Sequence, residues 1–429
     1  LSKKTLAVIF CISLILGIIL FFLSSFIASN IFNSPDLTIF LKIFSFILPF
    51  YVLLDTLLVF ILSYEKIIWH SFIFNVTQIA IRVLVLIFLI FFGFKANAVA
   101  FSYIAGTFIA FLLAFYVSKF IIKETFGKYK LSKKEKSQAF RSLFNYSWPL
   151  LFFGLIFSIF HWTDSFIIGI FLDVKFVGFY NAAVPIALLL TVTSQIFIQL
   201  FFPFITKKYS KDKKNLSVIK QLSKQVSKWI YIINLPVLIL MLIFPGVFIN
   251  LFFGSQYLIA ENALRLLAIG ALFNSVFVIS NNLISMLGKS KIILMDIILA
   301  AIINLILNII LVQSYGITGA AFATTISLIV LNLLFLIQAK HYLSVIPLRK
   351  NMIKITLITL IPTALLVFLR SQLGAVNLLS LILLGSLFGL AYIALLFLSK
   401  SLDKNDLLIL NAVLKKIGLK KRLSTDANY

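Results

Sequence analysis

Residues 5–32 read TLAVIFCISLILGIILFFLSSFIASNIF and contain no charged side chain. A helix needs about 20 apolar residues to cross the hydrocarbon core of a bilayer. The stretch is long and lacks the alternating pattern of a barrel strand. Backbone polar groups in lipid must be satisfied within the segment itself, which leaves a helix. The stretch therefore predicts a membrane-spanning helix.

Similar stretches recur along the whole chain. Of its 429 residues, 62% are hydrophobic and 12% are charged, against about 25% charged in soluble domains. This composition excludes an ordinary soluble enzyme and a disordered chain. The spans are expected at 5–32, 38–63, 67–92, 97–118, 147–171, 178–205, 229–253, 260–286, 292–313, 317–339, 355–373 and 376–399. We therefore predict an all-α polytopic membrane protein with about 12 transmembrane helices.

The basic residues gather in alternate loops. Lys and Arg total 38 against 13 acidic residues, a net charge of +25. Large groups lie in 119–141, 207–228 and 400–422, which fall on one side if the spans alternate. The opposite side carries only Lys95, Lys175 and Arg370. By the positive-inside rule, we expect the cell membrane with both chain ends cytoplasmic. Topology explains the charge, and no nucleic-acid partner is expected.

The chain repeats one of its turns. GFKANAVAFS at Gly93–Ser102 aligns with SYGITGAAFA at Ser314–Ala323, and the charge rule gives both turns the same orientation. Parallel repeats of helix bundles are common in transporters, with a pathway between the halves. The repeat predicts two helical lobes divided at 119–146. The small residues after Gly319 allow close helix packing and by themselves require no transport role.

Several motifs resemble a known family. YGITGAAFAT at Tyr315–Thr324 resembles the turn into the twelfth helix of prokaryotic polysaccharide flippases. NYSWP at Asn145–Pro149, followed by DSFIIG at Asp164–Gly169, resembles their seventh helix. VGFYNAA at Val177–Ala183 is similar to the start of their eighth. The chain is thereby identified as a member of the multidrug/oligosaccharidyl-lipid/polysaccharide exporter superfamily.

The resemblance implies a domain plan. The family usually has 14 helices, in two pseudo-symmetric six-helix lobes around a central cavity plus two C-terminal helices, and here the first two helices would be missing. We expect an incomplete N-lobe (family helices 3–6) at 1–122 and a cytoplasmic linker at 123–146. A C-lobe (family helices 7–12) follows at 147–340, then two extra helices at 341–399 and a basic amphipathic tail at 400–429.

The resemblance also implies a function. Such proteins move a lipid-pyrophosphate-linked oligosaccharide from the cytoplasmic to the outer leaflet by alternating access. The chain would then be a transporter and not an enzyme, and a monomer. Its partners would be the lipid-linked oligosaccharide, membrane lipids, and a polysaccharide polymerase or glycosyltransferases. The alternative is a sodium- or proton-coupled multidrug or metabolite antiporter of the same superfamily. A membrane polymerase would need a long outer loop, which the sequence lacks.

Ionisable residues inside spans are costly and are candidates for the transport pathway. Arg82 and Asp55 lie in adjacent spans and could form an ion pair, or Arg82 could bind the lipid pyrophosphate, since its guanidinium matches phosphate oxygens. Lys42 and Arg265 lie near the outer ends of corresponding spans. They could receive the phosphates, or snorkel to the headgroups. Glu261 lies one turn before Arg265 and could pair with it.

His161 and Asp164 are one turn apart in one span. Asp164 could bind a coupling cation or sugar hydroxyls, or be an interfacial carboxylate capped by Thr163 or Trp162. No third ligand lies nearby, so no metal site is expected. The sequence has no phosphate-binding loop, so no nucleotide cofactor is expected. Amides that could line a sugar cavity or join helices are Gln78, Asn181, Gln195, Gln199, Asn274, Asn281, Asn282, Asn304 and Asn308.

Three cytoplasmic segments have helical periodicity. In 216–226, apolar residues at Leu216, Ile219, Leu222 and Val226 recur among lysines, and residues 407–417 follow a similar pattern. Both segments predict amphipathic helices on the inner leaflet. Residues 132–144 are read either this way or as a solvated linker.

Overall fold

The computed structural model describes residues 2–94, 96–126, 158–211, 216–373 and 377–399, with Gln138, residues 154–155, Ser401, Asp403 and Asp406. Every regular element among these residues is a helix, and ten of the helices are long and apolar enough to cross a membrane. The predicted all-α polytopic class is therefore confirmed. The chain forms two compact units, Leu1–Phe152 and Phe153–Tyr429. The matching of their helices to particular family helices stays a prediction.

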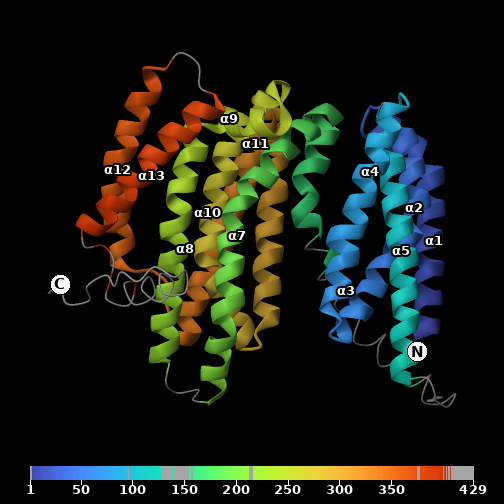
Figure 1. Ribbon diagram of the computed structural model, residues 1–429, viewed down its shortest axis with the longest axis horizontal. Helices are drawn as coiled ribbons and strands as arrows, with labels where there is room; N and C mark the ends of the chain where they lie inside the picture. Colours follow the sequence, from blue (N-terminus) through green and yellow to red (C-terminus); the bar gives the residue numbers. More distant parts are fainter. Residues whose placement is uncertain are drawn as a thin grey trace. The chain divides into compact units, whose positions relative to one another are not determined.

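Unit 1 is a bundle of helices coloured blue to cyan in Figure 1. It contains α1 (Ser2–Phe26) with a π-helical end at Ile27–Ile31, α2 (Leu37–Ser63), α3 (Ile67–Ser71), a π-helix at Phe72–Thr77, α4 (Gln78–Phe91) and α5 (Asn97–Phe126). Leu54, Leu58 and Ile61 of α2 pack with Ala110 and Ala114 of α5 in the buried core. Small residues such as these alanines let helix backbones approach closely in lipid.

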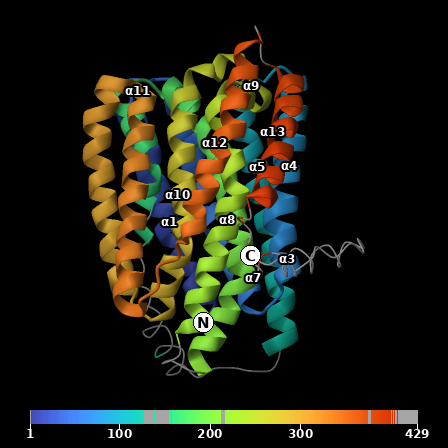
Figure 2. The ribbon, with the colours of Figure 1, turned by 90° about the vertical axis from the view of Figure 1, so that its left-hand side faces the viewer.

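Unit 2 contains a helical segment at 158–171 and seven labelled α-helices. These are α7 (Val174–Lys211), α8 (Ser217–Ile243), α9 (Pro245–Phe253), α10 (Glu261–Met286), α11 (Ser290–Leu343), α12 (Lys350–Ser371) and α13 (Leu378–Leu398), with a 3-10 helix at Ser255–Ala260 before α10. α10 lies centrally and packs against α7, α8 and α11. Figure 2 shows α12 and α13 beside α8, on the outside of this group.

The predicted surface helix at 216–226 is wrong. Leu216 is the N-cap of α8 and residues 217–226 form its first turns, with Ile219 and Val226 buried in the main core of unit 2. Ser223 and Ser227 are also fully buried, so neighbouring helices cover this stretch instead of lipid headgroups. The periodicity therefore indicated a helix correctly, but its apolar face packs against protein.

The helix boundaries differ from the expected spans at two places. The expected span 229–253 is divided at Phe244, because Pro245 has no amide hydrogen and disfavours a helical residue before it. The spans expected at 292–313 and 317–339 are both in α11, which is kinked at Gly316 (φ 58°, ψ −140°). At Gly319, a Cβ atom would lie 2.1 Å from the Leu311 carbonyl oxygen, so the kink requires glycine there.

A buried ionic cluster joins the segment after α13 to α8; we call it the tail clasp (Lys228, Ser401, Asp403, Asp406 and Arg349). Lys228 is fully buried, and its Nζ lies 2.5 Å from Asp406 Oδ2 and 3.2 Å from Asp403 Oδ2. It also donates to the Ser401 carbonyl at 3.0 Å, and Arg349 pairs with Asp403. The predicted amphipathic segments 132–144 and 407–417 lie outside the described residues, apart from Gln138.

Candidate functional site

Asp164 is the centre of a buried polar cluster in unit 2, which we call the Asp164 cluster (Asp164, Tyr180, Asn304, Asn308 and Thr324). The Asp164 side chain is only 7% exposed. Its Oδ1 accepts hydrogen bonds from Asn308 Nδ2 at 2.8 Å and Asn304 Nδ2 at 3.5 Å. Its Oδ2 accepts from Thr324 Oγ1 at 2.6 Å and from the Tyr180 hydroxyl. Three helical segments therefore meet at one carboxylate.

The backbone explains how these residues come together. Asn304 and Asn308 are four residues apart, so they share one face of α11. The kink at Gly316 follows, and Thr324 after the kink lies near Asn304 before it, with Asn304 Nδ2 3.0 Å from Thr324 Oγ1. Sequence reasoning singled out both amides but missed Tyr180 and Thr324. Both belong to the family-like motifs VGFYNAA and YGITGAAFAT, which was the available signal.

The Asp164 cluster contains no cationic side chain. Among the described residues, no Lys, Arg or His forms a salt bridge with Asp164. A buried carboxylate is tolerated only when it is hydrogen-bonded, paired or protonated. Asn304 Oδ1 and Asn308 Oδ1 are also buried, and no hydrogen-bond donor reaches either oxygen from the part of the chain that the structure describes. Oxygen atoms of this kind are the ligands that hard cations take, so the cluster has the chemistry to accept a proton or a small cation.

His161 does not belong to the Asp164 cluster, although the sequence placed both on one face. His161 is exposed and lies edge-on to Trp162, with ring centroids 5.3 Å apart. Trp162 is also exposed, and the Thr163 hydroxyl donates to the Ile159 carbonyl. Neither residue therefore caps Asp164. The three-residue offset rotates His161 by about 60° around the helix, which is enough to move it off the buried face.

Arg82 lies in unit 1 in a setting that we call the Arg82 slot (Gln78, Arg82, Tyr103, Gly106 and Thr107). Its guanidinium carbon is 4.1 Å from the centroid of the Tyr103 ring, and Nη2 donates to Thr107 Oγ1 at 3.4 Å. Arg82 Nε is buried and has no acceptor among the described residues, and the same holds for Gln78 Nε2 one turn earlier.

Of the two alternatives for Arg82, the ion pair with Asp55 is not formed. Asp55 is exposed on α2 and forms no salt bridge with Arg82. Gly106 gives the physical reason: a Cβ atom there would lie 2.4 Å from Arg82 Cγ. The missing side chain leaves room on α5 for the stem of Arg82, and the guanidinium then contacts Tyr103 and Thr107 of the same helix.

The two outer bases have different environments. Lys42 is exposed, with Nζ 5.5 Å from the Phe21 ring centroid. Arg265 donates to the Leu242 carbonyl at 3.0 Å and pairs with Glu261 at 3.4 Å, so its charge is compensated locally. The Arg265–Glu261 pair agrees with the pairing that the four-residue spacing of the two side chains allowed. Lys42 and Arg265 belong to different units, and a joint role at the outer mouth stays a prediction.

The chain is similar to proteins named for glycan transport. A probable low-salt glycan biosynthesis flippase of Haloferax volcanii is 29% identical over 300 residues, covering 69% of this chain and 56% of the relative. A putative O-antigen transporter of Shigella flexneri is 28% identical over 196 residues, 45% of each chain. The chain thus spans about half the length of the curated relatives it matches.

A solved structure has the same fold. The lipid II flippase MurJ, in its inward closed conformation, matches with a TM-score of 0.72 and 20% identity over 92% of this chain and 83% of that chain. At this identity the likeness is one of fold alone. A family profile described as polysaccharide biosynthesis protein matches residues 2–262, more than half of the sequence. The chain therefore belongs to the polysaccharide biosynthesis protein family.

Proposed function

We propose that the protein is a flippase for surface polysaccharide biosynthesis. It moves a lipid-pyrophosphate-linked oligosaccharide from the cytoplasmic to the outer leaflet by alternating access. The observation that carries this proposal is Arg82, a half-buried cation in a membrane-spanning helix without a carboxylate partner among the described residues. Charges inside a bilayer are expensive and normally have a counter-ion. The guanidinium fork matches phosphate oxygens, so the substrate pyrophosphate is a suitable counter-ion.

The relatives support this assignment through their names, a glycan biosynthesis flippase and an O-antigen transporter. We further infer a transporter without catalytic chemistry that acts as a monomer in the cell membrane. The alternation of basic loops along the sequence supports a cytoplasmic position for both ends of this chain. Its partners would be the lipid-linked oligosaccharide, membrane lipids and the polymerase or glycosyltransferases that use the same substrate. Lys42 and Arg265 would contact the phosphates at the outer end, and the exposed side chains of Asp55 and His161 are kept as candidates for the lining of the substrate cavity.

The Asp164 cluster suggests how transport is driven. Binding of a proton or sodium ion at Asp164 would neutralise the carboxylate and draw in the unpartnered oxygens of Asn304 and Asn308. The same observation favours a second candidate function, a sodium- or proton-coupled antiporter of the superfamily for multidrug or metabolite substrates. The two candidates differ in the charge of the substrate that they move.

Reconstituted protein tests both candidates. We would measure translocation of a fluorescent lipid-pyrophosphate oligosaccharide in proteoliposomes. We expect Arg82→Ala to lower the rate at least about tenfold, because a hydrogen bond to a charged group contributes roughly 1.5–3 kcal/mol. Arg370→Ala is the matched control, since Arg370 also lies over an aromatic ring, Phe244, at 5.7 Å. We expect its rate to match that of the unmutated protein.

Asp164→Asn tests the coupling role in the same vesicles. We expect the rate to lose its dependence on a sodium or pH gradient, because the neutral amide cannot exchange a cation. Gel filtration in detergent checks that each variant is folded. If the unmutated protein leaves the lipid probe in place but drives efflux of organic cations with either gradient, the flippase assignment is wrong and the antiporter remains.

A further inference from the structure

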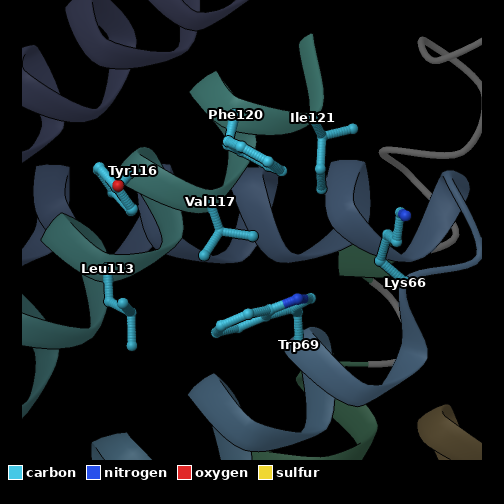
Figure 3. A pocket seen from close by; sticks show the side chains of 7 residues that line it. All are labelled: Lys66, Trp69, Leu113, Tyr116, Val117, Phe120 and Ile121. Carbon is cyan, nitrogen blue, oxygen red and sulfur yellow. The ribbon is translucent and has the colours of Figure 1, made fainter. Parts of the chain in front are cut away.

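A pocket of about 250 Å³ lies between α3 and α5 in unit 1 (Figure 3). Six of its seven lining residues are apolar or aromatic, among them Trp69 at one wall and Phe120 at the other. The remaining one is Lys66, in the loop before α3. Water occupies about 30 Å³ per molecule, and whole-ligand sites measure about 300–1,000 Å³. The pocket therefore has room for a part of an amphipathic molecule.

The pocket exists because α3 is short and diverges from α5. α3 ends at Ser71, and the chain continues as a π-helix over Phe72–Thr77 before α4 begins. Each π-turn disturbs the regular packing of a helix. α4 packs along α5, whereas α3 does so much less, and Figure 1 shows the two helices separating towards the end where α3 begins.

The nitrogen atoms of the Lys66 and Trp69 side chains lie at one end of the pocket, and Leu113 and Tyr116 lie at the other (Figure 3). In Figure 3 the indole nitrogen of Trp69 lies on the Lys66 side of the ring, and the ring extends towards Leu113. Neither Lys66 Nζ nor Trp69 Nε1 has a hydrogen bond or ion pair with a described residue. Lys66 lies at the basic side of the membrane, and Leu113 on α5 lies eight residues before Ile121, about 12 Å deeper along the helix.

We propose that this pocket binds an anionic phospholipid of the leaflet on the basic side. The phosphate accepts hydrogen bonds from Lys66 Nζ and Trp69 Nε1, and the first part of an acyl chain packs along Leu113, Val117 and Phe120. Charge complementarity decides the occupant. Lys66 forms no ion pair with a described residue, Glu65 beside it included, and juxtamembrane lysines attract anionic lipids. A zwitterionic headgroup carries a cation of its own, which weakens its binding beside Lys66. This inference does not depend on the proposed transport function.

Fluorescence of Trp69 tests the proposal directly. The other three tryptophans, Trp148, Trp162 and Trp229, are replaced by Phe, and the full chain is reconstituted into phosphatidylcholine vesicles. Brominated phosphatidylglycerol or brominated phosphatidylcholine is then added at equal mole fractions as the quencher. We expect about fivefold stronger quenching by the anionic lipid, the preference that one lysine near a membrane surface supplies.

Three variants in this background complete the test. Lys66→Gln should abolish the preference, Lys66→Arg should keep it, and Lys220→Gln, at an exposed lysine of α8 outside the pocket, should leave it unchanged. Equal quenching by the two lipids before any change at Lys66 would overturn the proposal. A preference that survives Lys66→Gln in folded protein would also overturn it, because the charge of Lys66 would then not select the lipid.

Discussion

At the residue scale, the Asp164 carboxylate depends on neutral donors alone. Asn308, Thr324 and Tyr180 each donate to it, and no cationic side chain shares the site among the described residues. A buried acceptor that loses a donor incurs a desolvation cost, which is larger when the group is charged. The stability of unit 2 should therefore respond to each donor individually.

Thr324→Val and Thr325→Val form a matched pair at this scale. The Thr324 hydroxyl donates to Asp164 at 2.6 Å, whereas the Thr325 hydroxyl donates to the neutral Leu266 carbonyl at 2.8 Å. We expect Thr324→Val to lower the free energy of unfolding by about 1.5–3 kcal/mol and Thr325→Val by about 0.5–1.5 kcal/mol. Thermal unfolding in detergent measures both. Equal losses would mean that Asp164 is neutral or solvated in the folded protein.

At the element scale, the tail clasp attaches the chain after α13 to α8 and α12. Lys228 and Asp406 are both fully buried, and Asp403 also pairs with Arg349 at the start of α12. Removing one partner of a buried ion pair leaves an uncompensated charge, whereas replacing both by apolar residues is often neutral.

Lys228→Met should therefore lower the free energy of unfolding by about 3–5 kcal/mol. Adding Asp406→Leu should restore most of that loss, because no unpaired charge then remains between α8 and the tail. Lys354→Met is a suitable control, since Lys354 is exposed and its one hydrogen-bond partner within the described ranges is the Ser399 carbonyl. We expect little change. Melting temperatures in detergent report all three. A double variant as unstable as Lys228→Met would show that the cluster is not a buried ion pair.

At the scale of the whole molecule, charge in the loops determines orientation. The basic loops alternate with loops that carry few bases. The positive-inside rule therefore predicts that the basic loops of this chain lie on the cytoplasmic side. Each span carries the chain to the other side of the membrane, so successive loops lie on opposite sides. The side on which one labelled loop lies therefore gives the sides of the loops before and after it.

Cysteine labelling in a Cys11→Ser background tests this orientation, since Cys11 is the single cysteine. Ser290 follows the basic loop before α11, and Gln372 follows α12; both are exposed. We expect a membrane-impermeant maleimide to label Gln372→Cys in intact cells and Ser290→Cys only after permeabilisation. Labelling of Ser290→Cys in intact cells would reverse the predicted topology.

Local sequence patterns predict some helices of this chain more closely than others, for a physical reason. The first span was expected at 5–32, and the helix extends to Ile31, because hydropathy is a local property of the chain. The expected span 229–253 begins twelve residues too late, since α8 starts at Ser217. The first turns of α8 contain many polar residues, and neighbouring helices bury one face of them. Periodicity reports that a helix has an apolar face and does not report whether lipid or protein covers it.

The sequence by itself determined the membrane class, the positions of most spans and the family-like motifs. These follow from apolar length and local residue patterns, which do not depend on the neighbouring helices. Only the tertiary structure decided that Asp164 meets Thr324 and that Arg82 turns to α5 and not to Asp55. Those choices depend on close backbone approach at Gly106 and on the kink at Gly316. Partner selection is therefore a property of helix faces brought together by packing, which no local pattern encodes.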